Sequence, residues 1–210
     1  KINFRFKVDD EAKKTFVVKR YDIYNIPQQG YVIDRGVQEA TSGIAGNRYD
    51  AVTNLQNFSQ DEKNLINVYL PENNESVNKN GESVSQSERE TNSYAPNGDK
   101  SFTKAPDYAT YIVVYGDFTR TNADGRTDRY ADVNYTIHLG DFNETNWNNY
   151  DNERNCKYAY TITIKDVDNI VVEAEKEGDP QPGAEGIVID YTNGKNFLLD
   201  SHYEDCVMQF

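Results

Sequence analysis

The sequence predicts an all-β fold, a sandwich or a barrel, and three observations support this prediction. Apolar residues alternate with polar ones over many short stretches, which is the period of a β-strand with one buried face. Asn, Asp, Gly, Ser and Thr separate these stretches, as expected of turns between strands. The chain also has 16 tyrosines and 9 phenylalanines, which suit half-buried sheet surfaces, and very little amphipathic helical pattern.

The strand pattern recurs along most of the chain. Alternation predicts strands over residues 2–8, 16–24, 65–70, 108–118, 133–139, 158–164 and 170–174, with weaker ones over 186–191, 197–200 and 206–210. Residues 166–169 are expected to form the hairpin turn between two of these strands. One helical turn is expected at residues 61–64, and residues 37–43 fit no single assignment.

Two polar stretches divide the chain. Residues 71–104 are expected to form a long polar loop, since they hold too few large apolar residues for a core of their own. Residues 176–183 combine charges with Pro and Gly and are expected to be a linker. The main domain is therefore predicted at residues 1–175. Residues 184–210 are too few for a domain and would be the start of a second module, an appended hairpin or a donor strand.

The charge of the chain excludes two classes of partner. The formal net charge is −13, from 35 acidic and 22 basic side chains, so the surface repels nucleic-acid phosphates and anionic lipids. No apolar run approaches the ~20 residues of a membrane-spanning helix, so no direct membrane insertion of this chain is expected. No signal segment is visible, because Lys1 leads directly into a strand pattern.

Motifs for catalysis are missing, and the chain is predicted not to be an enzyme. There is no phosphate-binding glycine loop and no cysteine pair at metal-ligand spacing, so no cofactor, metal or catalytic residue is expected. His138 is expected on the wetter face of its strand, as a surface or half-buried structural residue. Residues 122–128 have some look of a calcium loop but lack its closing Glu, which favours an ordinary turn.

Two features leave alternatives open. Trp147 and Tyr150 lie in a stretch rich in Asn and Asp and are candidate glycan contacts, or else belong to a hairpin loop whose Trp covers the core edge. Cys156 and Cys206 are either bridged or two small half-buried apolar side chains.

Five segments, taken together and in order, resemble the fimbrillin-like cell-surface proteins of Bacteroidales, the family of type V pilus subunits. They read NIP at 25–27, VYLPEN at 68–73, APDYATYI at 105–112, RNCKYAYTI at 154–162 and DVDNI at 166–170. The motifs mark turns and paired strands and carry no catalytic residue. Asp166 departs from the family pattern, where Gly is common at this place, and the lipoprotein signal is absent from this chain.

The resemblance implies a transthyretin-like Greek-key β-sandwich with a long polar loop and little helix. It also implies export as a lipoprotein to the outer membrane, location in a fimbrium at the cell surface, and polymerisation by strand exchange. Partners would be other fimbrial subunits or further copies of the chain. A glycan or protein on a host or bacterial surface would be the target of adhesion.

The function predicted from the sequence is therefore that of a fimbrial or adhesive subunit acting through β-strand pairing. A strand-exchange segment is expected at the C-terminal end, where Cys206, Met208 and Phe210 share one face; it comprises Cys206, Val207, Met208, Gln209 and Phe210. Residues 2–8 are its N-terminal equivalent, and each segment alternatively completes its own sheet. The second hypothesis is a carbohydrate-binding β-sandwich module that uses Trp147 and Tyr150.

Overall fold

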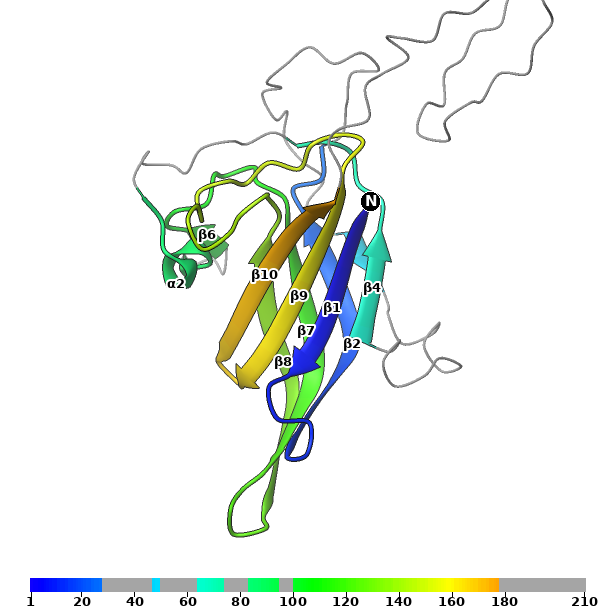
Figure 1. Ribbon diagram of the computed structural model, residues 1–210, viewed down its shortest axis with the longest axis vertical. Coiled ribbons are helices and arrows are strands. Elements are labelled where there is room, and N and C mark those ends of the chain that lie inside the picture. Colours follow the sequence, from blue (N-terminus) through cyan, green and yellow to red (C-terminus); the bar gives the residue numbers. More distant parts are fainter. Residues whose placement is uncertain (28–46, 50–63, 74–82, 95–99, 178–210) are drawn as a thin grey trace, which may run out of the picture.

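The computed structural model describes residues 1–27, 47–49, 64–73, 83–94 and 100–177, in which two four-stranded sheets lie face to face (Figure 1). The β1 sheet has the strand order β10–β9–β1–β4, and the β7 sheet has the order β3–β2–β7–β8. The first comprises β1 (Ile2–Val8), β4 (Leu65–Val68), β9 (Lys157–Asp166) and β10 (Asn169–Glu177). The second comprises β2 (Lys14–Tyr24), β3 (Asn47–Tyr49), β7 (Tyr111–Thr121) and β8 (Thr127–His138). The predicted all-β, sandwich-like fold is confirmed.

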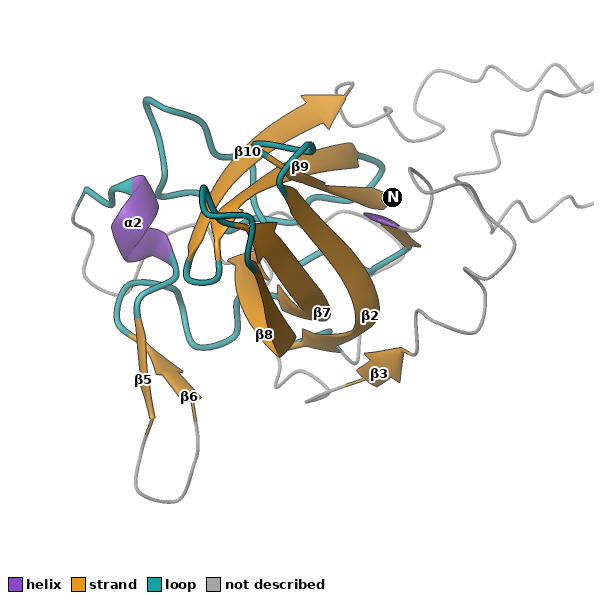
Figure 2. Cartoon of the chain, turned by 90° about the horizontal axis from the view of Figure 1, so that it is seen from below, coloured by secondary structure: helices purple, strands orange, loops and turns teal. Residues whose placement is uncertain are grey.

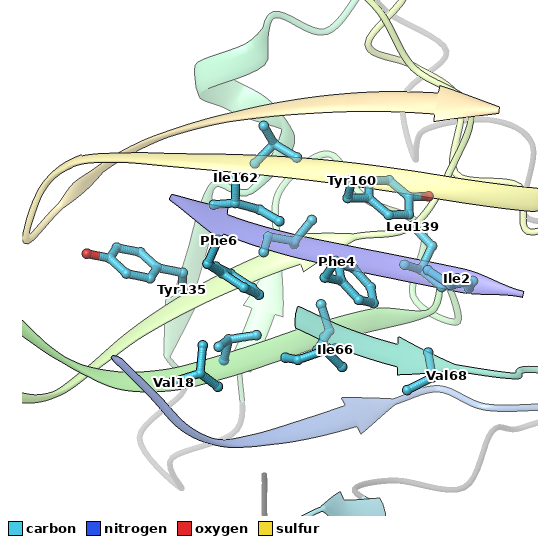
Figure 3. Close-up of a cluster of buried hydrophobic side chains, with 14 of the residues drawn as sticks. Ile2, Phe4, Phe6, Val18, Ile66, Val68, Tyr135, Leu139, Tyr160 and Ile162 are labelled. Carbon is cyan, nitrogen blue, oxygen red and sulfur yellow. The ribbon is translucent and has the colours of Figure 1, made fainter. Parts of the chain in front are cut away.

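The main core lies between the two sheets and follows the period of two in the sequence. Phe4, Phe6 and Ile162 of the β1 sheet face Val18 of the β7 sheet, as Figure 3 shows. Phe118 and Ile137 add to the same cluster and are 0 % exposed. Alternation places all these side chains on the inner faces of the sheets, where their burial supplies most of the free energy of packing.

A second, smaller apolar cluster covers part of the outer face of the β7 sheet. It contains Phe102, Ala105, Ala109, Tyr111, Val113 and Tyr150. Strand β7 serves both clusters, because Ile112 and Val114 belong to the main core while Tyr111 and Val113 point the other way. This explains why residues 111–114 are apolar without interruption instead of alternating.

The expected long polar loop at residues 71–104 is in part an ordered segment, which corrects the sequence prediction. Helix α2 (Gln86–Arg89) is followed by strand β5 (Asn92–Tyr94), which pairs with β6 (Lys100–Phe102). The β5–β6 pair extends away from the sandwich (Figure 2). Val84, Arg89 and Phe102 are buried, so this polar segment anchors itself on the sandwich with a few side chains.

The predicted turns and several strand positions agree with the structure. Strands β9 and β10 form a hairpin in which Asn169 pairs with Asp166, as expected. The β7–β8 hairpin closes through an ordinary turn in which Asn122 N–H donates to the carbonyl of Arg126, and Gly125 has φ +82°. Strand β10 runs to Glu177, so the first two residues of the expected linker lie in this strand.

Several expected features lie outside the described residues. They are residues 178–183 of the linker, the whole C-terminal part 184–210 with its three weaker strands, residues 37–43 and most of the helical turn at 61–64. The division into a main domain at 1–175, a linker at 176–183 and a C-terminal part thus stays a prediction.

Candidate functional site

Strand β1 lies in the middle of its sheet and is the candidate strand-pairing site. It runs parallel to β9, from the pair Ile2 and Tyr158 to the pair Val8 and Ile164, and antiparallel to β4. All other strand pairs in the described sheets are antiparallel. Both neighbours of β1 are distant in the sequence, so no tight hairpin holds it in place.

Apolar side chains fix the register of β1. Ile2, Phe4 and Phe6 are 1 %, 0 % and 3 % exposed and point into the main core (Figure 3). The Phe4 ring stacks on the Tyr160 ring with centroids 5.1 Å apart. A slip by one residue would turn all three side chains to solvent, so the register of an inserted strand at this place is strongly determined.

Part of the β1 sheet edge is open beside this strand. Strand β4 pairs only with residues 2–5, so Phe6 and Val8 have no strand partner on that side in the described chain. A pocket of about 540 Å³ lies there, between β1 and β2. The Asn64 side chain stands at its border and binds β2 as a strand would: Nδ2 donates to the Phe16 carbonyl at 3.0 Å, and Oδ1 accepts from Val18 N–H at 3.4 Å. The backbone groups of β2 at this place are thus already bonded, whereas residues 6–8 of β1 lack a strand partner on the β4 side in the described chain, and an extended segment can pair with them.

The expected donor segment cannot be placed relative to the pocket between β1 and β2. Cys206, Val207, Met208, Gln209 and Phe210 lie outside the described residues. Cys156 is 4 % exposed, and burial raises the pKa of its thiol. Cys206, the other cysteine of the expected bridge, also lies outside the described residues, so both alternatives for this pair stay open.

The two candidate glycan contacts have different surroundings. Tyr150 is 0 % exposed, belongs to the second apolar cluster and offers no ring face to a ligand, and burial raises its pKa to about 12. Trp147 is half-buried and packs against Phe142 with ring centroids 5.4 Å apart, at the border of the main core. Both expectations for Trp147 are therefore compatible with its position, since it covers the core edge and borders a surface pocket.

A buried polar cluster joins α2 to the β7 sheet, and no sequence motif indicated it. The Arg89 guanidinium lies 4.0 Å from the ring centroids of both Phe142 and Tyr150. Its Nη2 donates to the Leu139 carbonyl at 2.8 Å, and its Nη1 donates to the Trp147 carbonyl at 2.5 Å. A cation that is 2 % exposed is thus matched by two carbonyls and two ring faces.

Glu90 completes this cluster at the edge of β8. Its Oε1 accepts from the backbone N–H of His138 at 2.9 Å, and its Oε2 lies 2.5 Å from His138 Nδ1. Burial opposes ionisation of Glu90, but His138 and Arg89 outweigh it, so the pKa of this carboxyl is held below its ordinary value. The charged form of Glu90 therefore stabilises the attachment of α2.

His138 lies where the alternation placed it, on the outer face of its strand, but it is not a wet residue. It is 0 % exposed, with the rings of Phe102, Tyr111 and Tyr150 around it at centroid distances of 4.3, 5.0 and 5.7 Å. The sequence prediction of a surface or half-buried histidine is wrong, because the second apolar cluster covers this face of the sheet. Its bond to Glu90 makes it a structural residue.

The described residues were found to contain neither a metal-ligand cluster nor a membrane-spanning helix. No group of three or more His, Cys, Asp or Glu side chains among them is arranged to hold a metal ion. Nor does the described part contain a helix long and apolar enough to cross a membrane.

Comparison with known proteins finds one family match and structural similarity to fimbrial proteins. The chain is similar in structure to fimbrial proteins of Bacteroidales, the group that its sequence motifs resemble. Residues 68–162 match the model of a family described as a domain of unknown function (DUF4906). No curated protein matches the sequence.

Two solved structures illustrate the likeness. One is the tip fimbrial protein Mfa3 from Porphyromonas gingivalis with a C-terminal truncation, at 13 % identity and a TM-score of 0.38, covering 83 % of this chain and 50 % of that one. The other is a fimbrial protein from Bacteroides vulgatus, at 12 % identity and a TM-score of 0.35, covering 84 % of this chain and 52 % of that one. The chain thus spans about half the length of these proteins, and the similarity concerns the fold alone.

Proposed function

We propose that the chain is a non-catalytic structural or adhesive protein of the cell surface, a fimbrial subunit or a fimbrial accessory or anchor component. It acts through β-strand pairing with other fimbrial subunits or with further copies of itself. The observation that supports this proposal most is the position of β1, which is central in its sheet yet joined to neither neighbour by a hairpin.

A central strand of this kind can be supplied by another chain. Without β1, strands β4 and β9 would each expose a row of unpaired backbone groups, and the Ile2, Phe4 and Phe6 sites would be empty. An extended segment restores the backbone bonds and fills alternate sites with apolar side chains. The C-terminal residues Cys206, Met208 and Phe210 have the same spacing as these three and are the proposed donor.

The remaining expectations form part of the same proposal. The sandwich would have the transthyretin-like Greek-key topology, and the protein would be an exported lipoprotein in a fimbrium at the outer membrane. Residues 178–210 would carry the linker and the donor strand.

Oligomeric state tests this proposal. Light scattering would compare the purified chain with a version that lacks residues 203–210, and with a variant Met208→Asp that keeps the length but places a charge on the apolar face. Ladders of multimers for the full chain and monomers for both altered forms are expected. Identical monomers in all three samples would contradict strand donation by this segment.

A carbohydrate-binding β-sandwich module is the second candidate, favoured by the pocket that Trp147 borders. Such a module would bind sugar as a monomer, so the scattering experiment separates it from a polymerising subunit.

A further inference from the structure

A pocket of about 430 Å³ lies on the side of the sandwich where the outermost strands β8 and β10 end the two sheets. Helix α2 contributes Gln86 and Arg89 to its lining, and Trp147 and Phe142 contribute aromatic side chains to its wall. Its volume falls within the range of about 300–1,000 Å³ that is usual for small-molecule sites. It is separate from the pocket of about 540 Å³ described above, which lies between β1 and β2.

Free polar side chains from three elements line this pocket. Gln86 comes from α2, Asn134 from β8, and Asp168 and Asn169 from the β9–β10 turn and the start of β10. None of the four side chains makes a hydrogen bond or an ion pair with another described residue. Amides offer both donors and acceptors, and a carboxylate offers acceptors, so the four together match a ligand rich in hydroxyl groups.

The aromatic wall is held in a fixed position. Trp147 packs on Phe142, and the Trp147 carbonyl accepts from buried Arg89. Arg89 also lies 4.0 Å from the centroid of the Phe142 ring. A ring fixed in this way presents a flat apolar surface beside the free amides without losing side-chain entropy when a ligand binds.

An extended peptide is a poor match for this pocket, although the edge of β8 borders it. At one end, Glu90 already accepts from the His138 N–H and Arg89 already donates to the Leu139 carbonyl. At the other end, Asp132 has φ +53° and the pairing register shifts, so the strand edge is irregular. Only a few residues between these points keep a regular edge, which is how proteins prevent strand addition.

The charges at the pocket argue against an anionic ligand. Arg89 is the one cation among its lining residues in the described chain, and both of its Nη atoms are bonded to carbonyls. Asp168 remains as a free carboxylate, and the chain as a whole carries −13, so an anion would be repelled. The free amides and the Trp147 ring match a ligand that combines hydroxyl groups with an apolar face.

We propose that this pocket binds a neutral mono- or disaccharide unit. The sugar ring lies against Trp147, and its hydroxyl groups bond to Asn134, Asp168 and Asn169. Tyr150 takes no part, because it is buried on the other side of Arg89. The site would serve adhesion to a glycan, and it does not depend on whether the chain polymerises.

The single tryptophan of the chain makes the test direct, since Trp147 is the only source of indole fluorescence. The full chain would be titrated with D-glucose, D-galactose, D-mannose, N-acetyl-D-glucosamine and lactose. A saturable change in emission with at least one of them is expected. If none of the five changes the emission, and none gives a saturation-transfer signal by ligand-observed NMR, the proposal is overturned.

Two variants locate the binding. Asn134→Ala and Asp168→Ala each remove one partner of a ligand hydroxyl and should weaken binding about 5- to 10-fold, as expected for one hydrogen bond. The matched control is Asn67→Ala, an exposed asparagine on β4 at the opposite end of the β1 sheet, which should bind like the parent. Unchanged affinity in both pocket variants, with circular dichroism like the parent, would contradict this site.

A peptide competitor separates this site from the strand-pairing proposal. A synthetic peptide of residues 203–210 should leave the Trp147 emission unchanged. If the peptide alters it and no sugar does, the pocket is a strand-addition site, and the sugar proposal fails while the fimbrial one stands. If a sugar binds and the chain is monomeric in light scattering, the sugar proposal stands and the fimbrial one fails.

Discussion

Strand β1 and the α2 segment are both attached to the sandwich, but by opposite means. Strand β1 is held by backbone pairing on two sides and by buried apolar side chains such as Phe4. The α2 segment is a single helical turn, and two charged side chains, Arg89 and Glu90, fix it to the edge of β8. The first attachment depends on apolar burial, and the second depends on a few hydrogen bonds that must all be made.

This difference has an energetic side. Apolar burial is proportional to area and tolerates small changes of geometry. A buried charge is stabilising only while its partners are present, and removing one partner leaves the full desolvation penalty of the other. The α2 segment should therefore respond sharply to single polar substitutions and to pH, whereas β1 should respond to loss of side-chain volume.

The largest effect is expected at β1. Phe4→Ala should lower the free energy of unfolding by about 4 kcal/mol, because a fully buried ring stacked on Tyr160 is lost and a cavity remains. Urea unfolding at pH 7 measures this. Val17→Ala, at a side chain that is 46 % exposed, is the control and should change it by less than about 0.5 kcal/mol. Loss of a buried ring is expected to cost well above 1 kcal/mol, so a loss below about 1 kcal/mol for Phe4→Ala would show that β1 contributes little to the core.

The second-largest loss of stability is expected at the polar attachment of the α2 segment. Arg89→Met keeps most of the volume between Phe142 and Tyr150 but leaves the Leu139 and Trp147 carbonyls without their donor, so the free energy of unfolding should fall by roughly 3 kcal/mol. Arg126→Met is the control, since that side chain is 85 % exposed in the β7–β8 turn, and no measurable change is expected there. Equal stability of both variants would refute the distinction between the two attachments.

A substitution at Gly140, beside the same polar cluster, should lower the free energy of unfolding by a smaller amount. At Gly140, with φ +144°, an added Cβ would meet the Asn149 carbonyl group and lie 2.9 Å from Arg89 Nη2. Gly140→Ala should therefore lower the free energy of unfolding by about 2 kcal/mol. At Gly125, with φ +82°, an added Cβ meets nothing, so Gly125→Ala should cost only the backbone strain, about 1 kcal/mol. Urea unfolding of the pair separates steric contact from strain.

The smallest effect should depend on pH. Because the pKa of Glu90 is lowered in the fold, its carboxylate stabilises the folded state above the ordinary pKa of 4.5, and this contribution is lost as the pH falls through the lower folded value. Glu90→Gln should reduce the free energy of unfolding by about 1 kcal/mol at pH 7. In urea titrations from pH 7 to pH 3, the gap between parent and variant should stay constant down to about the ordinary pKa of 4.5 and narrow below it. A gap that widens on acidification would reverse the assigned sign.

The sequence predicted the strands that fill the main core because most of them alternate and the others, such as residues 111–114 of β7, form short runs of β-branched and aromatic residues. It missed β3, β5 and β6, which have three residues each and are too short to show a period. Helix α2 had one readable signal: Ser85 is followed three residues later by Glu88, whose carboxylate accepts from the Ser85 backbone N–H at 3.0 Å. That signal is weak in a polar segment.

The candidate sites could be predicted only in part, and for a physical reason. Trp147 stood out by its rarity, but the burial of Tyr150 depends on Arg89, which lies far away in the sequence. The contact between Glu90 and His138 joins two segments that share no motif. Polar clusters of this kind arise from tertiary placement, and a local pattern carries no record of them.

The parallel pairing of β1 with β9 has a consequence for how the molecule folds. The β7–β8 and β9–β10 hairpins join neighbours in the sequence and can form early, whereas the partner of Ile2 is Tyr158, at the far end of the described chain. Contacts of such high contact order close slowly, since the intervening chain must first be brought together. Strand β1 is synthesised before its partner β9. Until β9 is available, Ile2, Phe4 and Phe6 are exposed to water. During that interval, its apolar face and free backbone are open to any other strand that arrives first.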